Sequence, residues 1–227
     1  DHTPGKPPDS PGTSLKILTQ MALHPGGGHE ELDQSVWPGQ DKRSTTRAAP
    51  VSATRTWLGT APDGHPYVAI HTVDGGYRLA DDMYVDWLVF QDLIGVDIAD
   101  ATTQHLVDAL GLVYGKPLSG PRIADTPAEA EIIATVGDVA HELAVRALTT
   151  GDPTLAAWAA GKGLDAEPVS EVLWRDLLRA AHQTGDPNRV RDVITQLDTV
   201  MDPVGGDLEP DTEALITQLT RRDPAPV

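Results

Sequence analysis

Apolar residues in the first third of the chain recur at the three- and four-residue spacing of helices, and then at the alternating spacing of strands. This pattern predicts three short helices over residues 14–23, 30–37 and 44–59, the first capped by Ser14. Two β-rich runs within residues 66–80 flank Asp74-Gly75-Gly76, which predicts a hairpin. Three helices followed by a hairpin are the elements of a winged helix-turn-helix.

From residue 100 onward the apolar spacing is helical throughout. Gly151-Asp-Pro153 recurs as Gly185-Asp-Pro187, where Gly ends one helix, Asp caps the next, and Pro takes the first helical position. The two copies are 34 residues apart, which is the period of tetratricopeptide helix pairs. Such pairs stack because neither helix buries its apolar face alone. The apolar segment 85–94 is expected to be a helix that joins the two parts rigidly.

The fold class predicted is therefore mostly α, a winged helix-turn-helix followed by a tetratricopeptide-like helical-repeat domain. We expect a disordered, proline-rich linker over residues 1–13. A winged-helix domain is expected over 14–81, helical repeats over 82–220, and a tail over 221–227. A capping box at Thr126-Pro-Ala-Glu129 is predicted to open a long helix.

The charge of the chain limits the kinds of partner it attracts. It has 17 Lys and Arg against 34 Asp and Glu, a formal net charge of −17. This charge opposes non-specific attraction to nucleic acid and to anionic membranes. The sequence contains no cysteine, which excludes disulfides and thiolate metal sites. Because the chain begins at Asp1 without a signal-peptide pattern, we expect it to be part of a longer protein.

No pattern for catalysis, a cofactor or a metal is present, and we expect the chain not to be an enzyme. Gly26-Gly-Gly-His29 lacks the Lys-Ser/Thr that completes a phosphate loop, so it is interpreted as a helix stop. The eight histidines do not show the i, i+4 spacing of a metal-binding helix. His141-Glu142 is interpreted as a solvated or capped pair rather than a catalytic base.

Several short motifs in the first part occur in a specific order. Residues 15–78 resemble a winged helix of the response-regulator type. The similarity rests on Ala22-Leu-His-Pro-Gly26, Glu30-Glu-Leu32, Val36-Trp-Pro-Gly39, Val51…Arg55…Leu58-Gly59 and Gly76-Tyr-Arg-Leu79. The resemblance implies that residues 44–59 form the helix that enters the major groove of promoter DNA.

Residues 82–219 resemble the bacterial transcriptional activator domain of actinobacterial antibiotic-regulatory activators. The motifs concerned are Asp86-Trp…Phe90, Leu106-Val-Asp-Ala-Leu110, Gly115-Lys-Pro-Leu118, Gly151-Asp-Pro153, Trp174-Arg-Asp-Leu-Leu-Arg179 and Asp207-Leu-Glu-Pro-Asp-Thr-Glu213. The resemblance implies that the repeats contact a protein partner or the transcription machinery. One branch of this family carries the pair at the C-terminus of long proteins with membrane helices and a LysM module. The expected location is the cytoplasm, or the cytoplasmic part of a membrane-anchored protein.

The resemblance also implies which residues contact DNA. Arg43, Arg47 and Arg55 are expected on phosphates or guanine, and Arg78 on the backbone from the wing. Hydrogen bonds to phosphate oxygens or base edges are expected from Thr45, Thr46 and Ser52. The alternative for Arg55 is a salt bridge within the protein.

A second hypothesis for the whole chain stays open. It is a protein–protein interaction module that kept the winged fold and lost DNA binding. Its support is the net charge of −17 and a third helix with few basic residues. DNA is the leading partner, and no small-molecule cofactor is expected.

Overall fold

The computed structural model describes residues 6–9, 11–39, 44–70, 76–119 and 127–221. It divides into two compact units. The first comprises Asp1–Val89 and Leu118–Ala128, and the second comprises Phe90–Pro117 and Glu129–Val227. This division falls later than the predicted domain boundary after residue 81. Each unit is described by itself.

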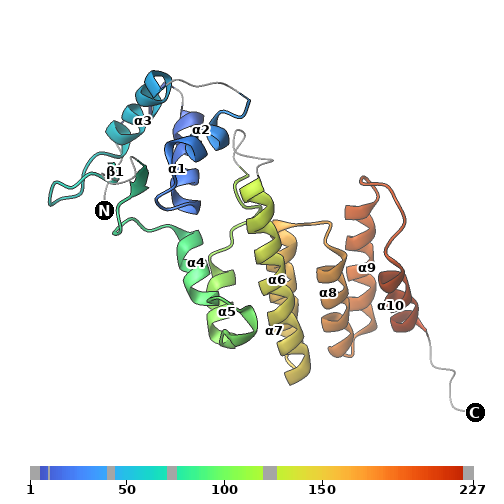
Figure 1. The fold of residues 1–227 in the computed structure, drawn as a ribbon. Helices are drawn as coiled ribbons and strands as arrows, with labels where there is room; N and C mark the ends of the chain where they lie inside the picture. Colours follow the sequence, from blue (N-terminus) through green and yellow to red (C-terminus); the bar gives the residue numbers. More distant parts are fainter. Residues whose placement is uncertain (1–5, 10, 40–43, 71–75, 120–126, 222–227) are drawn as a thin grey trace, which may run out of the picture. The chain divides into compact units, whose positions relative to one another are not determined.

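The first unit contains three helices and a two-stranded antiparallel sheet (Figure 1). The helices are α1 (Pro11–Leu23), α2 (His29–Val36) and α3 (Ser44–Leu58), and the strands are β1 (Val68–Ile70) and β2 (Tyr77–Leu79). Val68 pairs with Leu79, and Ala69 with Arg78. Helix, helix, helix and hairpin confirm the predicted winged helix-turn-helix. The predicted turn at Asp74-Gly75 lies outside the described residues.

The start of α1 corrects one prediction. The helix begins at Pro11, so residues 11–13 belong to it and not to a linker, and Ser14 lies inside the helix. Proline suits a first helical position because its missing N–H would have no partner there. Ser14 is buried, and the Thr54 hydroxyl on α3 donates a hydrogen bond to its Oγ at 2.8 Å. Ser14 therefore joins two helices instead of capping one.

The core of the first unit is a small apolar cluster shared by all its elements. Its buried members are Ile17, Met21, Leu32, Val36, Val51, Leu58 and Val68. Half-buried side chains from α1, α2 and the hairpin pack against this cluster. Because three short helices and a hairpin enclose only a small apolar core, polar contacts between these elements also stabilise the unit.

The second unit is helical, and α4 (Asp86–Ile94) crosses the division between the units. The remaining elements are η1 (Ile98–Asp100), α5 (Thr103–Gly111), α6 (Pro127–Thr150), α7 (Pro153–Ala166), α8 (Glu171–Gln183), α9 (Pro187–Met201) and α10 (Pro210–Thr220). Short turns connect α6 to α7 and α8 to α9, and α8 packs against α7, α9 and α10 (Figure 1). The predicted cap Thr126 lies outside the described residues.

The two Gly-Asp-Pro turns have the same construction. Gly151 and Gly185 adopt φ of 75° and 74°, a left-handed conformation that favours glycine. The Asp152 carboxylate accepts the Leu155 N–H at 2.9 Å, and the Asp186 carboxylate accepts the Asn188 N–H at 2.9 Å. Residues 152–202, all described, contain no strand. The predicted tetratricopeptide-like repeat is confirmed.

Contacts of α8 hold the repeats together. The Trp174 ring is buried, and its Nε1–H donates to the Pro168 carbonyl at 2.8 Å. Arg175 donates to Glu209 at 2.6 Å and to Thr212 at 2.9 Å, which ties α8 to the start of α10. Val172, near the start of this helix, is 38% exposed.

Candidate nucleic-acid interface

Helix α3 has two faces that differ in composition and size of side chain. Its buried face consists of Arg47, Val51, Thr54 and Leu58, at the spacing of one helical stripe. Its exposed face, over the part of the helix whose side chains are described, consists of Ala48, Ala49, Ser52 and Thr56. The helix therefore presents small, uncharged side chains to its surroundings and keeps one of its arginines inside.

Arg47 lies on the buried face of α3 and is only 8% exposed. Its guanidinium forms an ion pair with the Asp33 carboxylate on α2 and donates to the His29 carbonyl at 3.2 Å. These bonds fix α3 against α2. The expectation that Arg47 contacts DNA directly does not fit this burial, because its Nη1 group donates to two protein acceptors. The sequence spacing alone did not reveal that Asp33, fourteen residues earlier, faces the same point.

His29 continues this contact toward the wing. Its ring lies 5.0 Å from the Tyr77 ring on β2, measured between centroids. Burial lowers the pKa of His29, and the nearby Arg47 charge lowers it further. The neutral imidazole is therefore favoured beside the guanidinium. Asp33 and His29 thus connect α2 to both α3 and the hairpin.

Arg55 forms a second contact of α3, a hydrogen bond to the hairpin that is the wing of this fold. Its Nε–H donates to the Val68 carbonyl on β1 at 3.1 Å, and the side chain is half-buried. The predicted alternative was a salt bridge, whereas the partner in the structure is a backbone carbonyl. Together with the Thr54–Ser14 hydrogen bond, this contact joins α3 to the hairpin as well as to α1.

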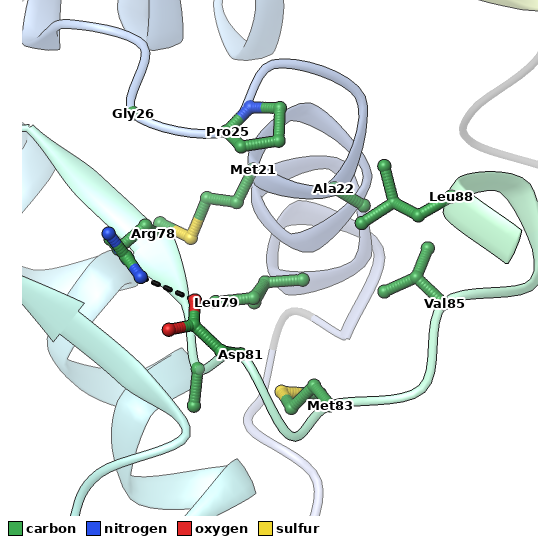
Figure 2. Close-up of a pocket in the computed structure, with 11 residues that line it drawn as sticks. Met21, Ala22, Pro25, Gly26, Arg78, Leu79, Asp81, Met83, Val85 and Leu88 are labelled. Atoms are coloured by element: carbon green, nitrogen blue, oxygen red, sulfur yellow. Dashed lines mark hydrogen bonds and ion pairs between the residues drawn. The ribbon is translucent and has the colours of Figure 1, made fainter. Parts of the chain in front are cut away.

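Arg78 extends from β2 and forms an ion pair with Asp81 just after the strand (Figure 2). Both side chains border a pocket of about 620 Å³ between α1, the end of the hairpin and the segment that follows. Most of the residues that line the pocket are apolar, among them Met21, Ala22, Pro25, Leu79, Met83, Val85 and Leu88. The Arg78 side chain is 39% exposed, so its guanidinium also reaches the surface.

The remaining predicted contacts are Arg43, Thr45, Thr46 and Ser52. Arg43 lies outside the described residues. Thr45 and Thr46 lie in the first turn of the helix, and their side chains are likewise outside the description. Ser52 is exposed. Among the predicted residues whose side chains the structure describes, Ser52, Arg55 and Arg78 are therefore accessible in whole or in part.

The base of the wing is closed by a histidine between two carboxylates. His65 Nδ1 lies 2.5 Å from an Asp63 oxygen, and Nε2 lies 3.0 Å from an Asp82 oxygen. A neutral imidazole has one N–H and satisfies only one such contact, whereas the imidazolium satisfies both. The Asp82 and Asp63 carboxylates accordingly raise the pKa of His65. The spacing of residues in the sequence did not predict this contact, because Asp82 follows the hairpin and lies 17 residues after His65.

Acidic residues are missing from the stretch that contains α3. From Lys42 to Pro62 the sequence holds four Lys or Arg and no Asp or Glu, although the chain has 34 acidic residues. Among the described residues no group of His, Asp and Glu is arranged to hold a metal ion. In the same part of the chain, no helix has the length and apolar character needed to cross a membrane.

No protein-family model matches the sequence, and a search of curated proteins found no match. Among solved structures, the chain is similar to Mycobacterium tuberculosis EmbR, determined in complex with a low-affinity phosphopeptide. The two are 21% identical with a TM-score of 0.56, over 99% of this chain and 62% of the other. The chain thus spans less than two thirds of that protein's length. The likeness concerns the fold, a winged helix followed by helical repeats.

Proposed function

We propose that this chain is a transcription-regulator-type module whose winged unit binds duplex DNA and whose repeats bind a protein partner. Helix α3 enters the major groove, and the hairpin lies beside the backbone. The fold supports this assignment, since the winged helix-turn-helix and helical repeats occur here in the order found in the resembled regulators. The phosphopeptide in the EmbR complex is bound by that protein, of which this chain spans 62%. A protein partner for the repeats is proposed here from the helical-repeat fold, because stacked helix pairs present an extended binding surface.

The observation that carries the DNA proposal is the segregation of charge. A chain with net charge −17 repels a polyanion, yet the stretch containing α3 has only basic and neutral side chains. Close approach to phosphates requires the absence of carboxylates as much as the presence of cations. The exposed face of α3 meets this requirement, because Ala48, Ala49, Ser52 and Thr56 are small and uncharged.

In this proposal the arginines have different tasks. Arg43, which directly precedes α3 in the sequence, and Arg78, on the wing, contact phosphates. Arg55 uses its Nε–H to hold β1, which leaves its terminal nitrogens for the DNA. Thr45, Thr46 and Ser52 donate hydrogen bonds to phosphate oxygens or base edges. Arg47 is a positioning residue that sets α3 against α2.

The competing function is a protein-interaction module. It is favoured by the burial of Arg47 and by the pairing of Arg78 with Asp81, which reduce the positive charge offered to phosphates. DNA affinity rests largely on such charges. The two functions differ in one measurable property, which is binding to duplex DNA at low salt.

The test is fluorescence anisotropy with labelled random-sequence duplexes at about 50 mM and about 200 mM salt. We expect binding at the lower concentration that weakens steeply at the higher one. Ser52→Glu adds a carboxylate to the exposed face of α3 and should abolish binding. Thr199→Glu adds the same charge to an exposed position of α9 and should leave binding unchanged. The absence of any duplex binding at low salt would favour the interaction module.

A further inference from the structure

The exposed face of α3 consists largely of methyl groups. Ala48 and Ala49 each present one, and Thr56 carries another about two turns further along the same face. None of the described side chains on this face is Asn, Gln, Lys or Arg. Those residue types make the paired hydrogen bonds that read adenine and guanine in the major groove.

Thr56 owes its apolar character to a bond within the helix. Its hydroxyl donates to the Ser52 carbonyl at 3.0 Å, one helical turn earlier. A hydroxyl has a single hydrogen, so this bond uses the donor of Thr56. The methyl group is the part of the side chain that remains for contact with a partner. Ser52 is then the one described hydroxyl donor on this face without such a bond to the preceding turn.

The major groove offers one apolar group for such a face to contact. Thymine carries a C5-methyl there, and apolar contacts from Ala and from the Thr methyl are the usual means of reading it. We infer that α3 selects duplexes by methyl–methyl contacts with thymines, through Ala48, Ala49 and Thr56. This inference rests on the proposed DNA binding and names the bases that the helix recognises.

The test compares thymine with uracil, which differs only by the C5-methyl. Duplexes that bind the full chain are first selected at low salt from a random library, and the sites are then resynthesised with deoxyuridine for thymidine. Burying one methyl group corresponds to about a fourfold change in affinity. With several thymines contacted, the uridine duplex should bind about tenfold or more weakly, and the selected sites should share thymines at fixed positions.

Two substitutions at one position assign the effect to α3. Thr56→Ser removes the methyl and keeps the hydroxyl, so it should reduce the ratio of thymidine to uridine affinity by about two- to fourfold. Thr56→Val keeps a methyl and removes the hydroxyl, so the ratio should stay as in the parent chain. Thr199→Ser on α9 is the matched control, since that threonine also donates to the carbonyl four residues earlier. Circular dichroism checks that each variant is folded.

The outcomes separate the inference from its premise. Duplex binding that is equal for thymidine and uridine sites overturns methyl recognition and leaves DNA binding intact. The same conclusion follows if Thr56→Ser and Thr56→Val behave alike. Failure to bind any duplex at low salt overturns the proposed DNA binding, and the inference falls with it.

Discussion

Helices α3 and α7 are similar in length and rich in alanine, but they use their alanines in opposite ways. In α3, Ala48 and Ala49 are exposed, while Arg47 and Thr54 share the buried face with two apolar residues. In α7 the buried face is made only of Ala156, Ala159, Ala160, Gly163 and Ala166. Small residues inside bring helices close together, whereas small residues outside leave a surface that a partner can approach closely.

The difference follows from what each helix has to contact. Gly163 in α7 lies so close to its neighbours that a Cβ there would be 2.5 Å from a Leu173 methyl carbon and 2.8 Å from the Ala140 Cβ. Helix α3 is instead held by side-chain bonds to α1, α2 and β1. Polar bonds have defined directions, so they set the orientation of a helix whose outer face must meet a partner.

Asp33→Ala should have the largest effect on the stability of the winged unit relative to the repeats, because it leaves the buried Arg47 charge without its partner. Breaking one side of a buried ion pair costs about 3–5 kcal/mol. We expect the winged unit to lose most of its stability while the helical repeats, which lack this pair, remain folded. Urea unfolding followed by hydrogen exchange of each unit measures this. Gln34→Ala, at the adjacent exposed position, should change stability by less than about 0.5 kcal/mol.

Gly163→Ala tests the close packing of α7. The added methyl overlaps Ala140 and Leu173, and overpacking of this kind costs about 1–3 kcal/mol. Gly161→Ala is the matched control on the same helix, since nothing lies within 4 Å of its added Cβ. That control should gain about 0.5–1 kcal/mol from helix propensity. Equal shifts of the two variants in thermal unfolding would contradict the close contact.

Ser14→Ala should destabilise the winged unit by about 1 kcal/mol. It removes the Oγ that lies 2.8 Å from the Thr54 hydroxyl, and the single hydrogen of Thr54 is then donated to the Pro50 carbonyl, which lies at 2.9 Å. The remaining acceptor limits the loss. Ser35→Ala, at an exposed position of α2, is the control and should be close to neutral in the same urea titration.

The smallest effect concerns pH and the base of the wing. The pKa of His65 is raised from 6.5 by Asp82 and Asp63, so the native state holds this proton more tightly than the unfolded chain. The resulting stability is fully present below pH 6.5 and is lost as the pH rises through the native pKa. A ring-proton NMR titration should give a higher titration midpoint for His65 in the parent chain than in the Asp82→Asn variant. Equal midpoints would show that the carboxylate does not act on the ring.

His29 should respond to pH in the opposite direction. Burial and Arg47 lower its pKa, so the unfolded chain takes up a proton more readily than the native state. Its contribution to stability is present above pH 6.5 and is lost as the pH falls through the native pKa. The same NMR titration reports both rings, and the two midpoints should lie on opposite sides of 6.5.

The helix order and the repeat were predicted from local signals. Proline and aspartate at Gly-Asp-Pro turns act within a few residues, so α7 and α9 begin at Pro153 and Pro187 as expected. The apolar spacing of α2 and α3 depends only on helical geometry. The start of α1 was placed wrongly because Ser14 suits a cap, while Pro11 three residues earlier also suits a first helical position.

The candidate site was only partly predicted. Ser52 could be placed on the exposed face from the helical period alone, because Val51 and Leu58 define the opposite side. The separate tasks of Arg47, Arg55 and Arg78 could not, because a long flexible side chain takes the partner that the fold brings near it. Asp81, the partner of Arg78, is only three residues away in the sequence, whereas Asp33, the partner of Arg47, is fourteen residues away.

The sequence by itself determined the helices, the repeat and the acid-free stretch around α3, since each follows from the order and spacing of neighbouring residues. Only the tertiary structure decided that Arg47 turns inward to Asp33, that Arg55 holds β1, and that His65 lies between two carboxylates. Pairings of this kind depend on distances between elements far apart in the chain, and those distances arise only when the core packs.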